Sequence, residues 1–167
     1  KKKLKQKKID IKKLKKIELE EALIKILSSP NHSSKDWVTN QYDQMVMCDT
    51  IQKSGSDAAI IRIHKKNKAI AVTVDSSANY CKSYPLNGGK QIVCENWRNL
   101  ISVGARPIAI TNCLNFGNPE NKEIMGEFAE SIQGIKEACE FLDFPVVSGN
   151  VSFYNGTNKK NIFPTPV

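Results

Sequence analysis

The sequence predicts an α/β (α+β) fold, in which helices pack on a sheet. Two apolar, β-rich runs at residues 58–63 and 69–74 flank the polar stretch 65–68, a pattern typical of a β-hairpin. Apolar residues recur at three- and four-residue steps over 92–101 and 124–142, which predicts two amphipathic helices. A hairpin followed by such helices indicates a mixed domain.

Further signals mark strands and helix boundaries. Residues 107–111 and 145–147 are short apolar segments that we expect to be strands. Gly104 would end the first helix, because glycine readily adopts the left-handed conformation that follows many helices. Asn118 would cap the second helix, since it precedes Pro119, a residue that suits the first helical position.

The N-terminal part is expected to be separate. We predict that residues 1–35 are a lysine-rich linker with one helix, and that residues 36–167 are the α/β domain, truncated at its C-terminal end. The helix is expected over about residues 11–28, because apolar residues lie near helical spacing there and Pro30 disfavours helix just before it. The apolar residues are Leu14, Ile17, Ile24 and Leu27.

The basic character of the chain lies in this linker. The formal net charge is +8, but residues 1–16 hold ten lysines and one acid, a net charge of +9. The remainder therefore carries −1, the difference between these two values. A lysine-rich tail can attract nucleic acid, but this one has no aromatic residues to stack on bases, and a solvated linker is the simpler interpretation. We expect no nucleic-acid partner.

Composition argues against several other classes. No apolar run approaches the roughly 20 residues that span a bilayer, so no membrane partner is expected. The five cysteines are odd in number and form no CxxC motif, which indicates reduced thiols in a cytoplasmic protein. Walker A and GxGxxG motifs are absent, and His32 and His64 are the only histidines, so no histidine-based metal cluster is expected.

Two polar segments are candidates for chemistry. Residues 111–119 and 146–152 place polar groups after predicted strands, near the carboxyl ends where α/β folds tend to bind ligands. Gly149 would let a backbone approach an anion, and Asn150 and Ser152 offer neutral oxygens that suit magnesium or phosphate. Asparagine and serine are also common in turns and caps, so the residue types alone leave both interpretations open.

These segments resemble phosphoribosylformylglycinamidine synthase, specifically the second half of its large synthetase subunit. The resemblance covers roughly residues 20–167, and its motifs occur in the family's order. The matching motifs are Gln41–Asp43, Gly55–Ala59, Gly88–Gly89, Arg98–Leu100, Gly104–Ile110, Thr111–Glu120 and Pro145–Asn155.

The resemblance implies an ATP-dependent ligase of de novo purine biosynthesis. The family converts formylglycinamide ribonucleotide to its amidine with glutamine-derived ammonia. The synthetase has two halves, each similar to aminoimidazole ribonucleotide synthetase, and their N-terminal domains pair to form a shared barrel. This chain resembles the N-terminal domain of the second half. Its implied partners are the remaining domains of the synthetase subunit, a glutaminase subunit and a small accessory subunit.

The family pattern also implies site residues. Asn112 and Gly149 would contact ATP, Asn150 would bind Mg²⁺, and Ser152 would contact the substrate, at its phosphate. No catalytic residue is assigned, because the family's catalytic histidine and most of its magnesium carboxylates lie in the first half. The fragment alone is therefore expected to be inactive.

The sequence departs from the family pattern at charged positions. Asn112 replaces an aspartate that is common in relatives, which removes a charge from the expected ATP contact. After Asp75, the residues Asn79, Tyr84 and Asn87 stand where relatives have Arg, Asp and Glu, so a separate nucleotide site in this half would be degenerate. Asp75 itself could be a metal ligand or a loop cap.

Two alternatives stay open. The domain could be a purely structural module that closes the barrel without touching a ligand, and an isolated copy would then form a homodimer with twofold symmetry. The chain could also belong to a related synthetase of the same superfamily, such as aminoimidazole ribonucleotide synthetase or selenophosphate synthetase.

Overall fold

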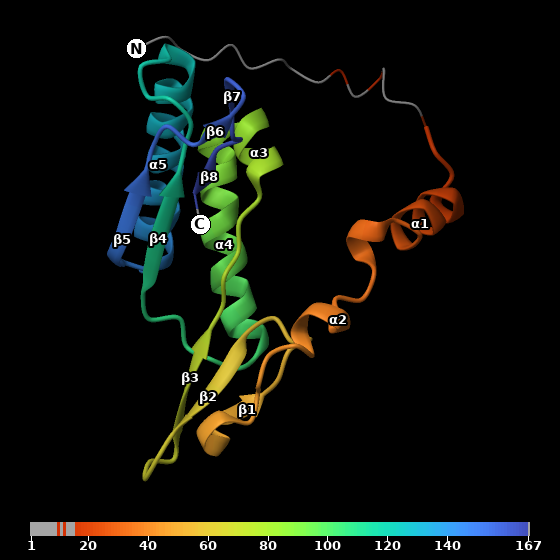
Figure 1. Ribbon diagram of the computed structural model, residues 1–167, viewed down its shortest axis with the longest axis vertical. Coiled ribbons are helices and arrows are strands. Elements are labelled where there is room, and N and C mark those ends of the chain that lie inside the picture. The colour runs from red at the N-terminus through yellow and green to blue at the C-terminus, as the bar shows by residue number, and fades with distance from the viewer. Residues whose placement is uncertain (1–9, 11, 13–15, 167) are drawn as a thin grey trace. The chain divides into compact units, whose positions relative to one another are not determined.

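The computed structural model describes residues 10, 12 and 16–166 (Figure 1). The described chain separates into two compact units, which meet in sequence between Asp49 and Thr50. The predicted division into a linker at residues 1–35 and a family domain at residues 36–167 has a different boundary and stays a prediction.

The N-terminal unit contains short helices. Helix α1 spans Leu19–Leu27, and α2 spans Asp36–Thr39. Single 3-10 turns, η2 and η3, lie at Pro30–His32 and Val46–Cys48.

The predicted helix over residues 11–28 is only partly confirmed. Lys16–Glu18 are not helical, and Leu14 lies outside the described residues. The observed start has a physical reason: Glu20 and Glu21 occupy the first turn, where negative charge suits the helix dipole. A start among the lysines would place positive charge there instead. The helix ends as expected, with Ser28 donating its N–H to the carbonyl of Ile24.

The second unit begins with the predicted hairpin. Strands β1 (Thr50–Gln52), β2 (Ala59–Ile63) and β3 (Lys68–Val72) form an antiparallel sheet in the order β1-β2-β3. Ile61 pairs with Ile70 across β2 and β3. Lys65, in the intervening turn, has a φ of 60°.

A second sheet carries the two polar segments. Strand β4 spans Ile110–Asn115 and pairs in parallel with β5, which spans Val146–Ser152. Strand β8 (Thr165–Pro166) lies antiparallel on the other side of β4, which gives the order β5-β4-β8. Strands β6 (Gly156–Thr157) and β7 (Lys160–Asn161) form a small separate hairpin.

The predicted strands at residues 107–111 and 145–147 were placed too early and made too short. Both observed strands continue through the polar segments that we expected to be loops. Asn, Ser and Gly have low intrinsic β-propensity, but pairing between the two strands satisfies their backbone groups and overrides that preference.

Three helices complete this unit: α3 (Ala78–Ser83), α4 (Pro85–Ser102) and α5 (Lys122–Leu142). Helix α4 begins earlier than predicted, because Pro85 occupies its first turn. Gly104 ends it as predicted, with a φ of 78°. The N–H groups of Gly104 and Ala105 donate to the carbonyls of Ile101 and Leu100 at 2.9 and 3.0 Å, the pattern of a Schellman cap. No helix in the described part of the chain is long and apolar enough to cross a membrane.

The predicted start of α5 at Asn118 is wrong. The Asn118 side chain accepts from the N–H of Glu120 at 2.9 Å, but it does so within a turn. Asn121 is the helix cap, and its side chain accepts from the N–H of Glu123 at 2.8 Å. Asn118 and Asn121 are three residues apart and have similar capping ability, so residue type alone did not show which of them caps the helix.

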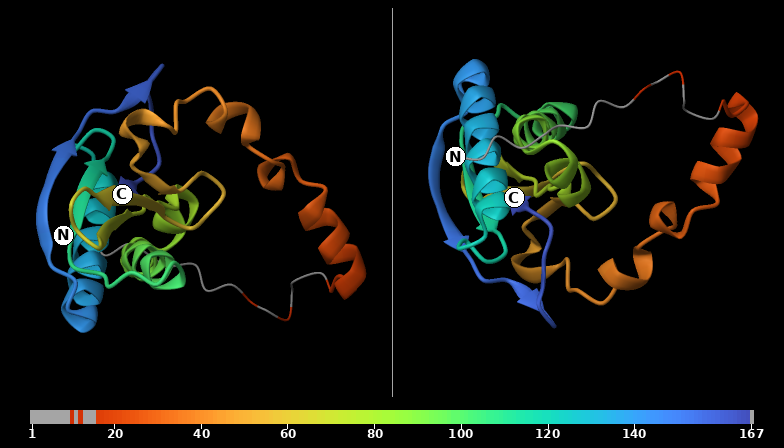
Figure 2. Two further views of the ribbon diagram at one scale, coloured as in Figure 1. Left: turned by 90° about the horizontal axis from the view of Figure 1, so that it is seen from below. Right: turned by 90° about the horizontal axis from the view of Figure 1, so that it is seen from above.

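The core lies where α4 and α5 pack with β4 (Figure 2). Phe116, Phe128 and Phe153 form an aromatic cluster at the end of β4, with centroid distances of 5.1 Å from Phe116 to Phe128 and 5.2 Å from Phe128 to Phe153. The buried hydrophobic core contains Ala58, Val93, Leu100, Leu114, Phe116, Ile124, Ile135, Ala138, Cys139 and Phe144. This arrangement confirms the predicted α/β class. Pairing of the sheet with a counterpart to form a barrel remains a proposal.

Helices α4 and α5 approach closely at glycines. A Cβ atom on Gly134 would overlap the backbone oxygen of Leu86, and one on Gly89 would overlap the backbone oxygen of Ser131. Both obstacles are backbone atoms, which cannot rotate away. Nearby, Lys82 of α3 forms an ion pair with Glu127 of α5, whose side chain is buried.

We predict that Gly134→Ala destabilises the fold by about 1–3 kcal/mol, because the helices must separate to admit the methyl group. Urea unfolding of the isolated chain measures the change. Glu140→Ala introduces the same residue at an exposed position of α5 and should change stability by less than about 0.5 kcal/mol. Equal stability of the Gly134→Ala variant and the parent chain would contradict the close packing described above.

Candidate functional site

The β4–β5 pair brings all four predicted site residues together. Its register aligns Asn112 with Gly149, Cys113 with Asn150, and Asn115 with Ser152. Successive side chains of a strand point to opposite faces of the sheet, and aligned residues share a face. Asn112 and Gly149 therefore lie on one face, whereas Asn150 and Ser152 lie on the other.

The face with Asn112 is the one that the helices cover. Along β4, Ile110, Asn112 and Leu114 are more buried than the residues between them, and Leu114 belongs to the core. A Cβ atom on Gly149 would overlap the side-chain oxygen of Asn112 and approach its backbone oxygen. The Asn112 carboxamide thus occupies the space that a side chain at position 149 would need, which explains the glycine there.

The opposite face of the pair, which we call the polar face, consists of six small residues. They are Thr111, Cys113 and Asn115 on β4, and Ser148, Asn150 and Ser152 on β5. Four of these six were missed as site candidates from the sequence: Thr111, Cys113, Asn115 and Ser148. Every second residue of the two segments points to this face, but the alternation was not recognised because the strands were predicted to end at residues 111 and 147. None of the six is an acid or a base with charge at neutral pH.

An open groove with a volume of about 450 Å³, which we call the β5 groove, lies mainly against β5. Asn112, Gly149 and Asn150 all line it, together with Leu114, Val146, Val147, Ser148 and Val151. A ligand in this groove can therefore meet residues from both faces of the strand pair. Ser152 follows at the end of the same strand.

Comparison with known proteins places this domain. Residues 55–166 match the family described as AIR synthase related protein, N-terminal domain. The chain belongs to this family.

Two relatives of this AIR synthase family domain carry the same name. The chain is 63% identical over 159 residues to the phosphoribosylformylglycinamidine synthase subunit PurL of Pelagibacter ubique. That match covers 95% of this chain but 22% of the relative, so the chain spans about a fifth of the relative's length. A second relative of the same name, from Azorhizobium caulinodans, is 53% identical over 150 residues and is covered over 20% of its length.

Solved structures agree with the fold. The PurLQS structure from Thermotoga maritima matches with a TM-score of 0.74 and 37% identity, over 80% of this chain and 22% of that chain. The T. maritima PurL complexed with FGAR matches with a TM-score of 0.70 and the same identity, over 80% of this chain and 22% of that one.

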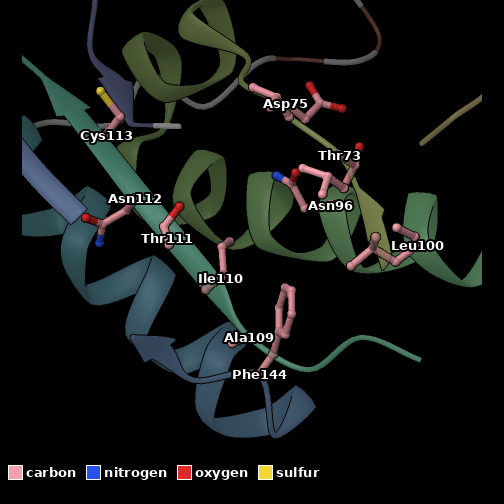
Figure 3. A pocket seen from close by; sticks show the side chains of 13 residues that line it. Thr73, Asp75, Asn96, Leu100, Ala109, Ile110, Thr111, Asn112, Cys113 and Phe144 are labelled. Carbon is pink, nitrogen blue, oxygen red and sulfur yellow. The ribbon is translucent and has the colours of Figure 1, made fainter. Parts of the chain in front are cut away.

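A second cavity of the AIR synthase family domain has a volume of about 430 Å³ and lies between β4, α4 and the segment after β3 (Figure 3). Thr73, Asp75 and Asn96 line it, and Asn112 points away from Thr73 and Asp75. Among the described residues, no group of three or more His, Cys, Asp or Glu side chains could hold a metal ion.

Asp75 is held by helix α4. Asn99 donates to its carboxylate at 3.3 Å. The pKa of neighbouring Glu95 is raised, first by burial and then by the charge and hydrogen bond of Asp75, while Arg98 opposes the shift. Asp75 therefore forms a carboxyl pair with Glu95 of α4. It does not cap α3, whose N-cap residue is Ser77.

We predict that Gly149→Ala destabilises the chain by about 1–3 kcal/mol, because the new methyl group collides with Asn112. The double variant Asn112→Ala/Gly149→Ala should recover part of this loss, since the side-chain obstacle is gone while the backbone oxygen remains. Ser148→Ala, one position earlier on the exposed polar face, is the control and should change stability by less than about 0.5 kcal/mol. Chemical unfolding of these three variants and of Asn112→Ala alone gives the changes in stability, and losses that simply add in the double variant would argue against the contact.

Proposed function

We propose that this chain is one domain of a phosphoribosylformylglycinamidine synthase. In this proposal the full-length protein is the ATP-dependent ligase that converts formylglycinamide ribonucleotide to its amidine with glutamine-derived ammonia. High identity to proteins of that name supports it, as do T. maritima PurL structures described as complexed with ATP and with FGAR. The observation that carries the site assignment is the β5 groove, which three of the four expected contact residues line together.

The proposed roles follow the two faces of the strand pair. Asn112 and Gly149 contact ATP from the helix-covered side, and Asn150 reaches a Mg²⁺ ion from the polar face. Ser152, at the end of β5, donates its hydroxyl to the phosphate of the substrate. Phosphoryl transfer gains mainly from positioning and charge neutralisation, so neutral contacts of this kind can contribute.

The residues of this chain can supply a small part of the ligands of a magnesium site. Mg²⁺ prefers six oxygen ligands in an octahedron, usually carboxylates, phosphate oxygens and waters. The polar face offers the neutral oxygen of Asn150 and contains no carboxylate. The other ligands would come from the nucleotide or from other parts of the full-length protein. When bound, the ion would neutralise phosphate charge.

The lack of charged groups on the polar face also supports the proposal that the fragment alone is inactive. Thr111, Asn115, Ser148, Asn150 and Ser152 cannot exchange protons near neutral pH as carboxylates or imidazoles do. We propose that the chain lends contacts to a site completed by the remaining domains of the synthetase subunit. A glutaminase subunit and a small accessory subunit are the further proposed partners, and the existence of a PurLQS structure supports a multi-subunit assembly.

We predict that Asn150→Ala in the full-length protein raises the magnesium concentration needed for half-maximal ATP turnover about tenfold, the effect of losing roughly 1.4 kcal/mol of binding. Steady-state kinetics across a magnesium titration provide the measurement. Lys66→Ala, in the β2–β3 turn, is a control that should behave as the parent protein does. Unchanged kinetics at every magnesium concentration would remove Asn150 from the site.

A second candidate function is closure of a barrel. Ile61 and Ile70 face each other across β2 and β3, and Val72 lies on the same face of the hairpin. These side chains are 42%, 54% and 48% exposed, although apolar cross-strand pairs are normally covered. We propose that this apolar stripe packs against a counterpart domain in the full-length protein.

We predict that the isolated chain forms a homodimer through this stripe, so that light scattering at high concentration gives about twice the monomer mass of 18.7 kDa. The double variant Ile61→Lys/Ile70→Lys should remain monomeric, because it places charges in the contact. Lys66→Glu changes a charge in the adjoining turn and should dimerise normally. A monomeric parent chain would count against the barrel.

A further inference from the structure

The turn that follows β5 is organised by one asparagine side chain. The Asn155 amide nitrogen lies 3.0 Å from the hydroxyl oxygen of Ser152, 3.0 Å from the backbone oxygen of Ser152 and 3.0 Å from the backbone oxygen of Phe116. Its amide oxygen lies 3.3 Å from the Ser152 hydroxyl. Both residues are half-buried, so water competes only in part for these bonds.

Backbone hydrogen bonds hold the same turn against the loop after β4. Phe116 donates its N–H to Ser152 at 2.9 Å, and Asn155 donates its N–H to Phe116 at 3.2 Å. Tyr154 donates to Gly117 at 3.1 Å and has a φ of 60°, a left-handed conformation that is uncommon for a bulky residue. The surroundings therefore fix where the Asn155 side chain can reach.

We propose that Asn155 is a positioning residue, which orients the Ser152 hydroxyl so that its proton is directed to an anionic oxygen of the substrate. This inference rests on the proposed function, in which Ser152 contacts the substrate phosphate. A serine hydroxyl has one proton to donate and two lone pairs that accept. Asn155 donates to one lone pair at 3.0 Å, which fixes the side chain of Ser152, and the Ser152 proton is directed only to a long bond of 3.3 Å to the Asn155 amide oxygen.

The Ser152 proton has two possible acceptors. The Asn155 amide oxygen lies at 3.3 Å, which is long for an O–H···O bond. A phosphate oxygen would be the stronger acceptor, since hydrogen bonds to ionised groups are shorter and about twice as strong. A hydroxyl that already accepts a hydrogen bond is also polarised toward donating one. Asparagine supplies this arrangement, whereas aspartate would only accept and would draw the proton inward.

The test is a double-mutant cycle in the full-length protein that carries this chain. Ser152→Ala and Asn155→Asp should each raise the KM for formylglycinamide ribonucleotide about tenfold, the loss expected for one charge-assisted hydrogen bond. The KM for ATP should change less than about twofold in both, since those contacts lie elsewhere on β4 and β5. The double variant should match Ser152→Ala alone, because Asn155 acts through that hydroxyl.

Two further variants keep the result interpretable. Asn155→Ala removes the side-chain bonds without adding charge, and it replaces Asn155→Asp in the same cycle if thermal unfolding shows that the aspartate variant does not fold. Asn67→Asp makes the same chemical change in the exposed β2–β3 turn and should leave both KM values unchanged. Effects of positions 152 and 155 that add in full would overturn the positioning role and leave the proposed function intact. No effect of Ser152→Ala on the substrate KM would overturn the proposed contact and the inference together.

Discussion

The parallel ladder between β4 and β5 is the constraint on which the candidate site depends. It aligns Asn112 with Gly149 and Asn115 with Ser152, although the whole of α5 separates them in sequence. A shift of one residue in this register would exchange the faces and move Asn150 to the covered side. Such a shift would replace Gly149 opposite Asn112 by a residue with a side chain. Because the Asn112 carboxamide leaves no room for a Cβ atom at that place, packing and register support each other.

Helix packing holds this ladder in place. Gly89 and Gly134 let α4 and α5 approach to backbone contact, and their apolar faces then meet Leu114 from β4. The aromatic cluster of Phe116, Phe128 and Phe153 lies where both strands run into loops. The polar turn with Asn155 is thus anchored from the core side, and small groups on its surface can be held in fixed positions.

The chemical character of the site is small, polar and uncharged. Such groups orient a ligand and satisfy its hydrogen bonds, but they supply little of the charge that a nucleotide with a metal ion requires. This supports the proposal that the domain completes a site built largely elsewhere. Of the carboxyl pair formed by Asp75 and Glu95, Asp75 lines the second cavity. Asn99 donates to Asp75, and Arg98 opposes the rise in the pKa of Glu95.

The sequence by itself determined the fold class, the hairpin, the helix stop at Gly104 and the identity of the polar segments, because each rests on local periodicity or on glycine's conformational freedom. The family resemblance of the sequence then singled out Asn112, Gly149, Asn150 and Ser152 within those segments. The sequence did not show that these residues lie inside strands, since their types favour turns and only pairing between distant segments overrides that preference. Nor could it show that Asn112 and Asn150 face opposite sides, or that Asn155 reaches Ser152. Those facts depend on the register of β4 against β5, and tertiary packing decides that register.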